Sequence, residues 1–97
     1  REFLKLKACY LMRDRVGQVF DGVIVGMDEG VMWVLLDRPV VEGVVPERLF
    51  EERPHFDEAT YSMVLRRTKR VFRIGQRIKV RLVGVDFEQR SLLFCPL

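Results

Sequence analysis

The arrangement of apolar and polar residues predicts strands over most of the chain from Gln18 onward. The strictest alternation covers residues 77–83, where three apolar residues share one face and Arg77, Lys79 and Arg81 share the other. Four more segments, rich in β-branched or apolar residues, have the length of strands: 19–27, 31–36, 40–45 and 91–95. Short strands separated by Gly-marked turns are typical of a small closed sheet. We therefore expect an all-β fold, a five-stranded antiparallel barrel.

The first sixteen residues have the pattern of a helix. Residues 1–16 contain no Pro or Gly and are rich in Leu, Lys and Arg. Five side chains can form an apolar stripe: Phe3, Leu4, Cys9, Leu11 and Met12. Gly17 is the expected end, because glycine readily adopts the left-handed conformation that follows many helices. We expect residues 1–16 to be the tail of a preceding domain and residues 17–97 to form the barrel.

The segment between the third and fourth predicted strands is less regular. Residues 46–59 are polar and acidic and include two prolines, which favours a loop or a single short helical turn. Residues 61–67 and 70–73 could form short extended pieces on either side of Thr68-Lys69. This middle segment is the least defined part of the prediction.

Length and composition fit one globular domain. The chain has 97 residues, of which 48% are hydrophobic and 32% charged, a balance that disfavours disorder. No apolar run approaches the ~20 residues that cross a bilayer. The chain starts at Arg1 without a signal-peptide pattern, which suggests a piece of a longer protein. Cys9 and Cys95 are too few for a disulfide scaffold, so we expect free thiols and a cytoplasmic location.

Charge is distributed unevenly along the chain. Residues 28–59 carry nine acidic and three basic side chains, whereas residues 60–97 carry nine basic and two acidic ones. A strongly basic segment suggests a polyanion partner, because Lys and Arg release condensed counterions when they bind phosphates. A solvated basic face balanced by the acidic middle is the alternative.

Catalytic chemistry is hard to build from these residues. His55 is the only histidine and lies in the predicted loop, and the two cysteines are too far apart in sequence for a zinc motif. The acidic pairs lie in predicted turns and loops rather than on the rigid elements that a two-metal site requires. We expect a non-catalytic chain that holds neither a cofactor nor a metal.

Binding has better candidates. Arg77, Lys79 and Arg81 on one strand could follow a phosphate backbone together with the basic segment that contains Arg66, Arg67 and Lys69. Trp33 on a neighbouring strand could stack on bases, the combination by which small barrels bind single strands. Alternatively, Trp33 fills the core and the basic strand only improves solubility.

Several motifs resemble a known family. Residues 17–24 and 42–45 resemble the opening and middle of the S1 RNA-binding domain, an OB-fold barrel. The version at the C-terminal end of ribonuclease R and ribonuclease II is the most similar, through Phe56-Asp57, Leu65-Arg66-Arg67-Thr68 and residues 72–80. Residues 10–17 also resemble the junction that precedes the domain in those enzymes.

The resemblance implies an RNA-binding face. It assigns Trp33 as a stacking aromatic and Asp86 and Arg90 as the residues that bracket the last hairpin, and Phe20 belongs to the opening motif. The family's other aromatic is replaced here by Gly30-Val31 and its histidine by Pro46. Leu35, Leu93 and Cys95 are predicted to point outward where polar residues are usual, and such apolar residues can mark a contact surface.

The implied function is binding of single-stranded RNA for a 3′-to-5′ exoribonuclease. The domain would capture the strand and guide it to a catalytic domain in the same protein, where aspartates hold magnesium. Two alternatives stay open. One is an S1 module of a translation or transcription factor, and the other is a barrel that has lost RNA binding and contacts proteins instead.

Overall fold

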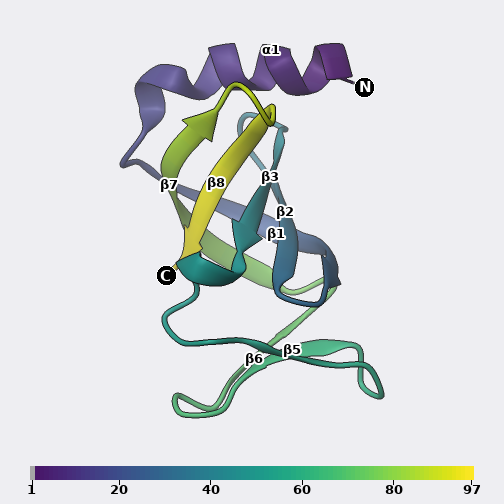
Figure 1. Ribbon diagram of the computed structural model, residues 1–97. Helices are drawn as coiled ribbons and strands as arrows, with labels where there is room; N and C mark the ends of the chain where they lie inside the picture. The colour runs from purple at the N-terminus through teal and green to yellow at the C-terminus, as the bar shows by residue number, and fades with distance from the viewer. Residues whose placement is uncertain (1) are drawn as a thin grey trace.

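The structure, a computed structural model, describes residues 2–97 (Figure 1). Helix α1 spans Glu2–Met12 and continues into a 3₁₀ turn, η1, at Arg13–Arg15. Five strands build the main sheet: β1 Val19–Asp28, β2 Val31–Leu36, β3 Glu42–Pro46, β7 Arg77–Asp86 and β8 Ser91–Pro96. Between β3 and β7 lie the 3₁₀ turn η2, Glu47–Leu49, and three short strands: β4 His55–Asp57, β5 Ser62–Leu65 and β6 Arg70–Arg73.

The five long strands close into a barrel in the order β1-β2-β3-β8-β7, with β7 pairing back onto β1. The predicted fold is therefore confirmed. Four of the neighbouring pairs are antiparallel, while β3 and β8 run parallel and meet at Val44 and Leu93. β3 and β8 run parallel because each is two antiparallel pairings away from β1, β3 through β2 and β8 through β7.

The core fills the barrel with residues from alternate positions of every strand. Met32, Val34 and Leu36 from β2 are buried, and residues from the other four strands meet them. Space at this core is tight, because a Cβ at Gly43 would overlap the ring of Phe94. The alternation within β7 is as predicted, with three apolar residues inward and the basic ones outward.

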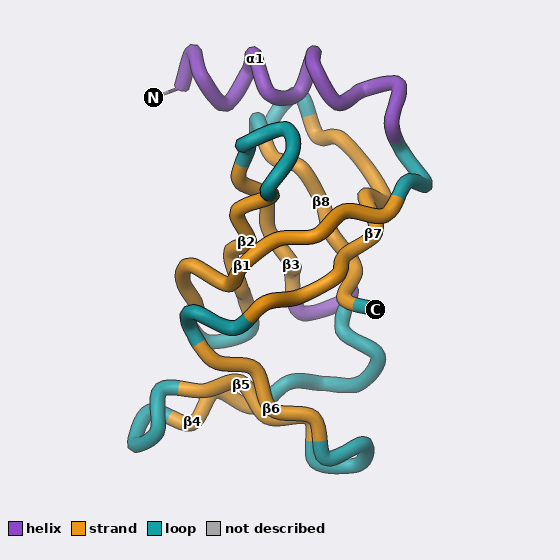
Figure 2. Tube along the Cα trace, turned by 180° about the vertical axis from the view of Figure 1, so that it is seen from behind, coloured by secondary structure: helices purple, strands orange, loops and turns teal. Residues whose placement is uncertain are grey.

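An insert sheet, formed by β4, β5 and β6, lies at the opposite end of the barrel from α1 (Figure 2). The sequence predicted extended pieces at β5 and β6, but β4 falls in the expected loop. The inner face of the sheet buries Met63 and Phe72, and the Phe72 ring packs edge-on against Phe50 at 5.7 Å. At the β4–β5 turn, the Tyr61 hydroxyl donates to the Met27 carbonyl at 3.2 Å.

Helix α1 is shorter than predicted and only partly buried. Arg1 lies outside the described residues, and regular helix stops at Met12. Of the predicted apolar stripe, Cys9 and Met12 are fully buried, but Phe3 and Leu4 are 72% and 65% exposed. Gly17 adopts a φ of +96°, as expected of a residue that ends a helix. Within residues 2–97, no helix is long and apolar enough to cross a bilayer.

Candidate nucleic-acid interface

An apolar row crosses the outside of the barrel, with one residue from each strand. Successive ladder partners are Gly26 on β1, Trp33 on β2, Val44 on β3, Leu93 on β8 and Gly84 on β7. The three side chains are half-buried, whereas the residues before and after each of them point into the core. Because side chains alternate along a strand, all three must face outward.

Both ends of the row are glycines, and the one on β1 leaves room for the Trp33 indole. A Cβ at Gly26 would lie 3.3 Å from Trp33 Cε3, and a Cβ at Gly84 would lie 3.5 Å from Leu93 Cδ1. The indole and the leucine therefore lie over the two glycines. Each glycine follows a bulge residue, Val25 or Val83, that has no ladder partner. The result is an apolar surface that a planar base can stack on.

Trp33 lies on the surface of the barrel, so the alternative that it fills the core is wrong. Its flanking residues Met32 and Val34 are fully buried, which fixes the direction of the indole. Leu35, Leu93 and Cys95 also take outward positions, as predicted. Val44 was not predicted, because Val44 and Val45 are both apolar and the sequence does not show which of them faces outward.

Phe20 requires a correction. Its side chain is only 6% exposed and belongs to the core, because it alternates with the outward residues Val19 and Asp21 on β1. The Arg15 guanidinium lies over its ring at 5.0 Å. A buried ring covered by a cation offers no face to a base, so Phe20 cannot stack on RNA.

The three basic residues of β7 face outward, but each already has a partner. Arg77 Nη1 donates to Asp37 Oδ1 at 2.9 Å, and its Nη2 donates to Oδ2. Lys79 Nζ donates to Asp21 Oδ1 at 2.7 Å. Arg81 Nη1 donates to the Gly17 carbonyl at 2.7 Å.

These partners come from elements that barrel closure places beside β7. Asp21 is the ladder partner of Lys79, and Asp37 follows β2. The hydrogen bonds from Arg77 lower the pKa of the Asp37 carboxyl and raise that of the Arg77 guanidinium. Two of the three predicted phosphate-binding cations are therefore neutralised within the protein.

Asp86 and Arg90 lie at the turn between β7 and β8, against α1. Asp86 Oδ1 accepts a hydrogen bond from the Gln89 amide at 2.9 Å and so shapes the turn. Arg90 adopts a φ of +55°, and its Nη1 lies 4.0 Å from Glu2 Oε2. Asp86 is the last residue of β7 and Arg77 the first, so the structure does not bring these predicted site residues together.

A separate basic group lies at the tip of the hairpin between β5 and β6. We call this group, the exposed residues Arg66, Arg67 and Lys69, the basic tip. No acidic side chain within residues 2–97 lies within 4.0 Å of their charged atoms. Its cations are therefore available to an external anion.

The backbone of the basic tip is fixed by Glu52. This carboxylate accepts hydrogen bonds from the Arg67 amide at 2.9 Å and the Thr68 amide at 2.8 Å. The bond from the Arg67 amide is the main reason that the pKa of Glu52 is lowered. Lys69 closes the turn, donating its amide to the Leu65 carbonyl at 2.9 Å with a φ of +68°. The basic run in the sequence predicted the cations of the basic tip. It did not predict that Glu52, fifteen positions before Arg67, fixes the backbone there.

No group of three or more His, Cys, Asp or Glu side chains within residues 2–97 is placed to hold a metal ion. Cys9 and Cys95 are free thiols, and burial is the main cause that raises the pKa of Cys9. What the described surface offers is stacking area and positive charge.

The model of the S1 RNA binding domain family matches residues 13–95. Among curated proteins, the chain is similar to ribonuclease R of Aquifex aeolicus, with 39% identity over 92% of the chain and 13% of the relative. It is also similar to ribonuclease R of Escherichia coli, with 30% identity over 89% of the chain and 11% of the relative. The chain therefore spans only about an eighth of the length of these relatives.

Among solved structures, the fold matches RNase R of Mycoplasma genitalium with a TM-score of 0.86. The match covers 96% of this chain and 15% of that one at 19% identity, so it concerns the fold alone. The same protein has been solved in complex with ribose methylated single-stranded RNA.

Proposed function

This chain belongs to the S1 RNA-binding domain family, and from that premise we propose that it binds single-stranded RNA through the apolar row. The observation that carries the proposal is Trp33, an indole held on the barrel surface over Gly26 and beside Val44. Stacking suits single strands, because their bases are free to leave one another and lie on an aromatic ring.

Arg81 is the strand cation best placed to hold a phosphate near the row. Its ladder partner is Cys95, which lies two residues beyond Leu93 on the outer face of β8. Its side chain donates to the Gly17 carbonyl, and no carboxylate within residues 2–97 forms an ion pair with it. Arg77 and Lys79 must exchange Asp37 and Asp21 for phosphate before they contribute.

The sole tryptophan of the chain provides the test. We expect oligouridylate to quench Trp33 fluorescence, and Trp33→Ala to weaken binding by about 1–3 kcal/mol without changing the salt slope, because stacking releases no counterions. Fluorescence anisotropy of labelled RNA over a salt series measures both quantities. Tyr10→Ala removes an exposed aromatic from α1, outside the apolar row, and serves as the control, with unchanged binding.

Normal RNA binding by a folded Trp33→Ala variant would rule out the apolar row as the site. If the unmodified chain bound no RNA at any salt concentration, the row would instead be a protein contact. That outcome would favour a barrel that has lost RNA binding and contacts proteins.

We further propose that the chain serves a longer 3′-to-5′ exoribonuclease of the ribonuclease R or II type. The similarity to ribonuclease R from two bacteria supports this, as does α1, whose Phe3, Leu4 and Leu11 are exposed and suited to contact a catalytic domain in the same polypeptide. The domain would capture the strand and guide it toward that catalytic domain, in the cytoplasm. Magnesium, in this proposal, is held by the catalytic domain.

A further inference from the structure

The basic tip lies just beyond the C-terminal end of β8, the strand that contributes Leu93 to the apolar row. Arg70, which follows the tip, donates from Nη2 to the Leu97 carbonyl at 3.0 Å, just beyond the end of β8. Leu93, in the row, precedes Leu97 by four residues, a distance of about 13 Å along an extended chain. Both views show the hairpin tip and the C-terminus on the same side of the molecule (Figures 1 and 2).

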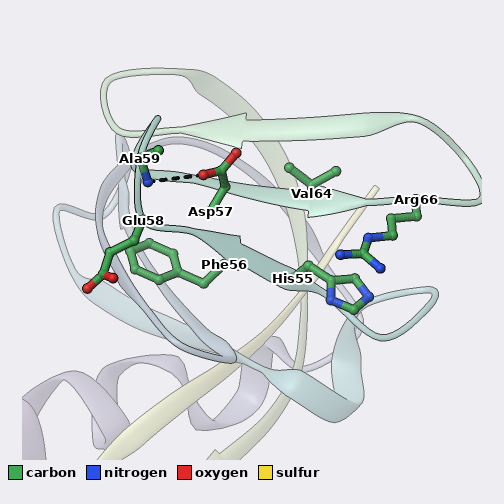
Figure 3. Close-up of a pocket in the computed structure, with 7 residues that line it drawn as sticks. All are labelled: His55, Phe56, Asp57, Glu58, Ala59, Val64 and Arg66. Atoms are coloured by element: carbon green, nitrogen blue, oxygen red, sulfur yellow. Dashed lines mark hydrogen bonds between the residues drawn. The ribbon is translucent and has the colours of Figure 1, made fainter.

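Beside the tip, the outer face of the insert sheet forms an open hollow of about 750 Å³. His55 and Arg66 lie at one end of it, where the guanidinium is directed toward the imidazole, and Glu58 lies at the other (Figure 3). Val64, the ladder partner of His55, forms part of the lining between them. Asp57 Oδ1 accepts a hydrogen bond from the Ala59 amide at 3.0 Å.

The two ends of the hollow therefore differ in charge. A phosphate is attracted to the Arg66 end and repelled by the acidic residues at the Glu58 end. The imidazole of His55 gives a base a ring to stack on at the favourable end. Nucleic acid fits this combination of a cation, a ring and an apolar lining better than an acidic peptide, which has no base to stack.

We propose that the basic tip and the adjoining His55 end of the hollow form a second contact for single-stranded RNA, occupied by nucleotides that extend beyond the apolar row past the end of β8. This inference rests on the proposed function, because the row must hold the first part of the strand. The domain then binds a longer RNA at two places. A short one reaches only the row.

The test compares a 4-nucleotide with a 12-nucleotide oligouridylate, using the full 97-residue chain and fluorescence anisotropy over a salt series. The double variant Arg66→Gln/Lys69→Gln should bind the 4-mer as the unmodified chain does. For the 12-mer its log–log salt slope should be flatter by about 1.4, at about 0.7 for each lost phosphate contact. The matched control is Lys5→Gln/Lys7→Gln, which removes two exposed cations from α1 and should leave both oligonucleotides unaffected.

Three outcomes would overturn the second contact. Equal losses for both oligonucleotides would place the tip and the row in a single site. A 12-mer slope that matches the α1 control would show that the tip does not touch RNA. Displacement of the 12-mer by polyglutamate from the unmodified chain, but not from the tip variant, would identify an acidic polypeptide as the partner. Failure of the unmodified chain to bind either RNA would instead reject the proposed function itself.

Discussion

Two groups of three cations, on β7 and at the basic tip, differ in what surrounds them. Arg77, Lys79 and Arg81 lie on a strand flanked by β1 and β8 in a closed barrel, within reach of acidic or carbonyl groups. The basic tip projects from a hairpin, where the carboxylate of Glu52 is engaged by backbone amides. The number of charges in a segment therefore does not give the charge available to a ligand. The neighbours that strand pairing brings beside each cation determine whether its charge is free.

Among the predictions for the two groups of cations, the largest effect comes from releasing those of β7. Asp21→Asn combined with Asp37→Asn frees Lys79 and Arg77 at little cost, since exposed ion pairs contribute only about 0–1 kcal/mol. RNA binding should strengthen by up to about 25-fold at 0.1 M salt, with a slope steeper by about 1.4. Anisotropy over a salt series measures both.

Asp14→Asn combined with Glu88→Gln is the control for net charge, because both residues are exposed and, within residues 2–97, neither carboxylate is paired with a β7 cation. A gain of the same size in this control would mean that overall charge, and not the pairing on β7, sets the affinity.

A smaller effect should separate the two groups one lysine at a time. Lys69→Gln removes an unpaired cation and should weaken binding of the 12-mer about fivefold at 0.1 M salt, with a slope flatter by about 0.7. Lys79→Gln removes a cation held by Asp21 and should change both quantities much less. If Lys79→Gln had the larger effect, RNA would displace Asp21 and the comparison would be reversed.

The smallest effect concerns the backbone of the basic tip. Glu52→Gln should speed amide hydrogen exchange at Arg67 and Thr68, since a carboxylate is the stronger acceptor. In the unmodified chain the lowered pKa of Glu52 means that this stabilisation is present at neutral pH. It is lost as the pH falls below the usual range of a glutamate and through the lowered pKa. Exchange measured by NMR at several pH values tests this, with the Gly75 amide, which donates to the Ile24 carbonyl, as the internal reference. Unchanged exchange at Arg67 in the variant would contradict the anchoring.

Local pattern predicted the barrel because each of its strands is long enough to be recognised. Residues 77–83 alternate in the sequence, whereas residues 31–36 are apolar throughout and indicated a strand only by length and composition. Which face Trp33 occupies became clear from the burial pattern of β2 in the structure. The insert sheet was only partly predicted, because β4 has three residues, too few to show a period, and follows Pro54. The predicted apolar stripe of the helix included Phe3, which the structure leaves exposed. Burial of Phe3 depends on what lies beside α1, and helical spacing does not reveal that.

The charges of the site could not be predicted in the same way. The contact of Lys79 with Asp21 joins residues 58 positions apart, and that of Arg77 with Asp37 joins residues 40 apart. Such pairs depend on the register between strands, which a single strand does not encode. Phe20 shows the same limit, because its place in a family motif did not reveal on which face of β1 it lies.

The position of β8 between β3 and β7 has a consequence for the order in which the barrel forms. Neither neighbour has its full set of backbone partners until residues 91–96 are in place, so β3 and β7 each keep an open edge until then. During synthesis, at about 5–20 residues per second, these two edges stay unpaired until β8 has left the ribosome. The β1–β7 ladder joins residues about 60 positions apart, and such distant pairing slows folding. Closure of the barrel therefore requires β8, the one strand that completes the ladders of both β3 and β7.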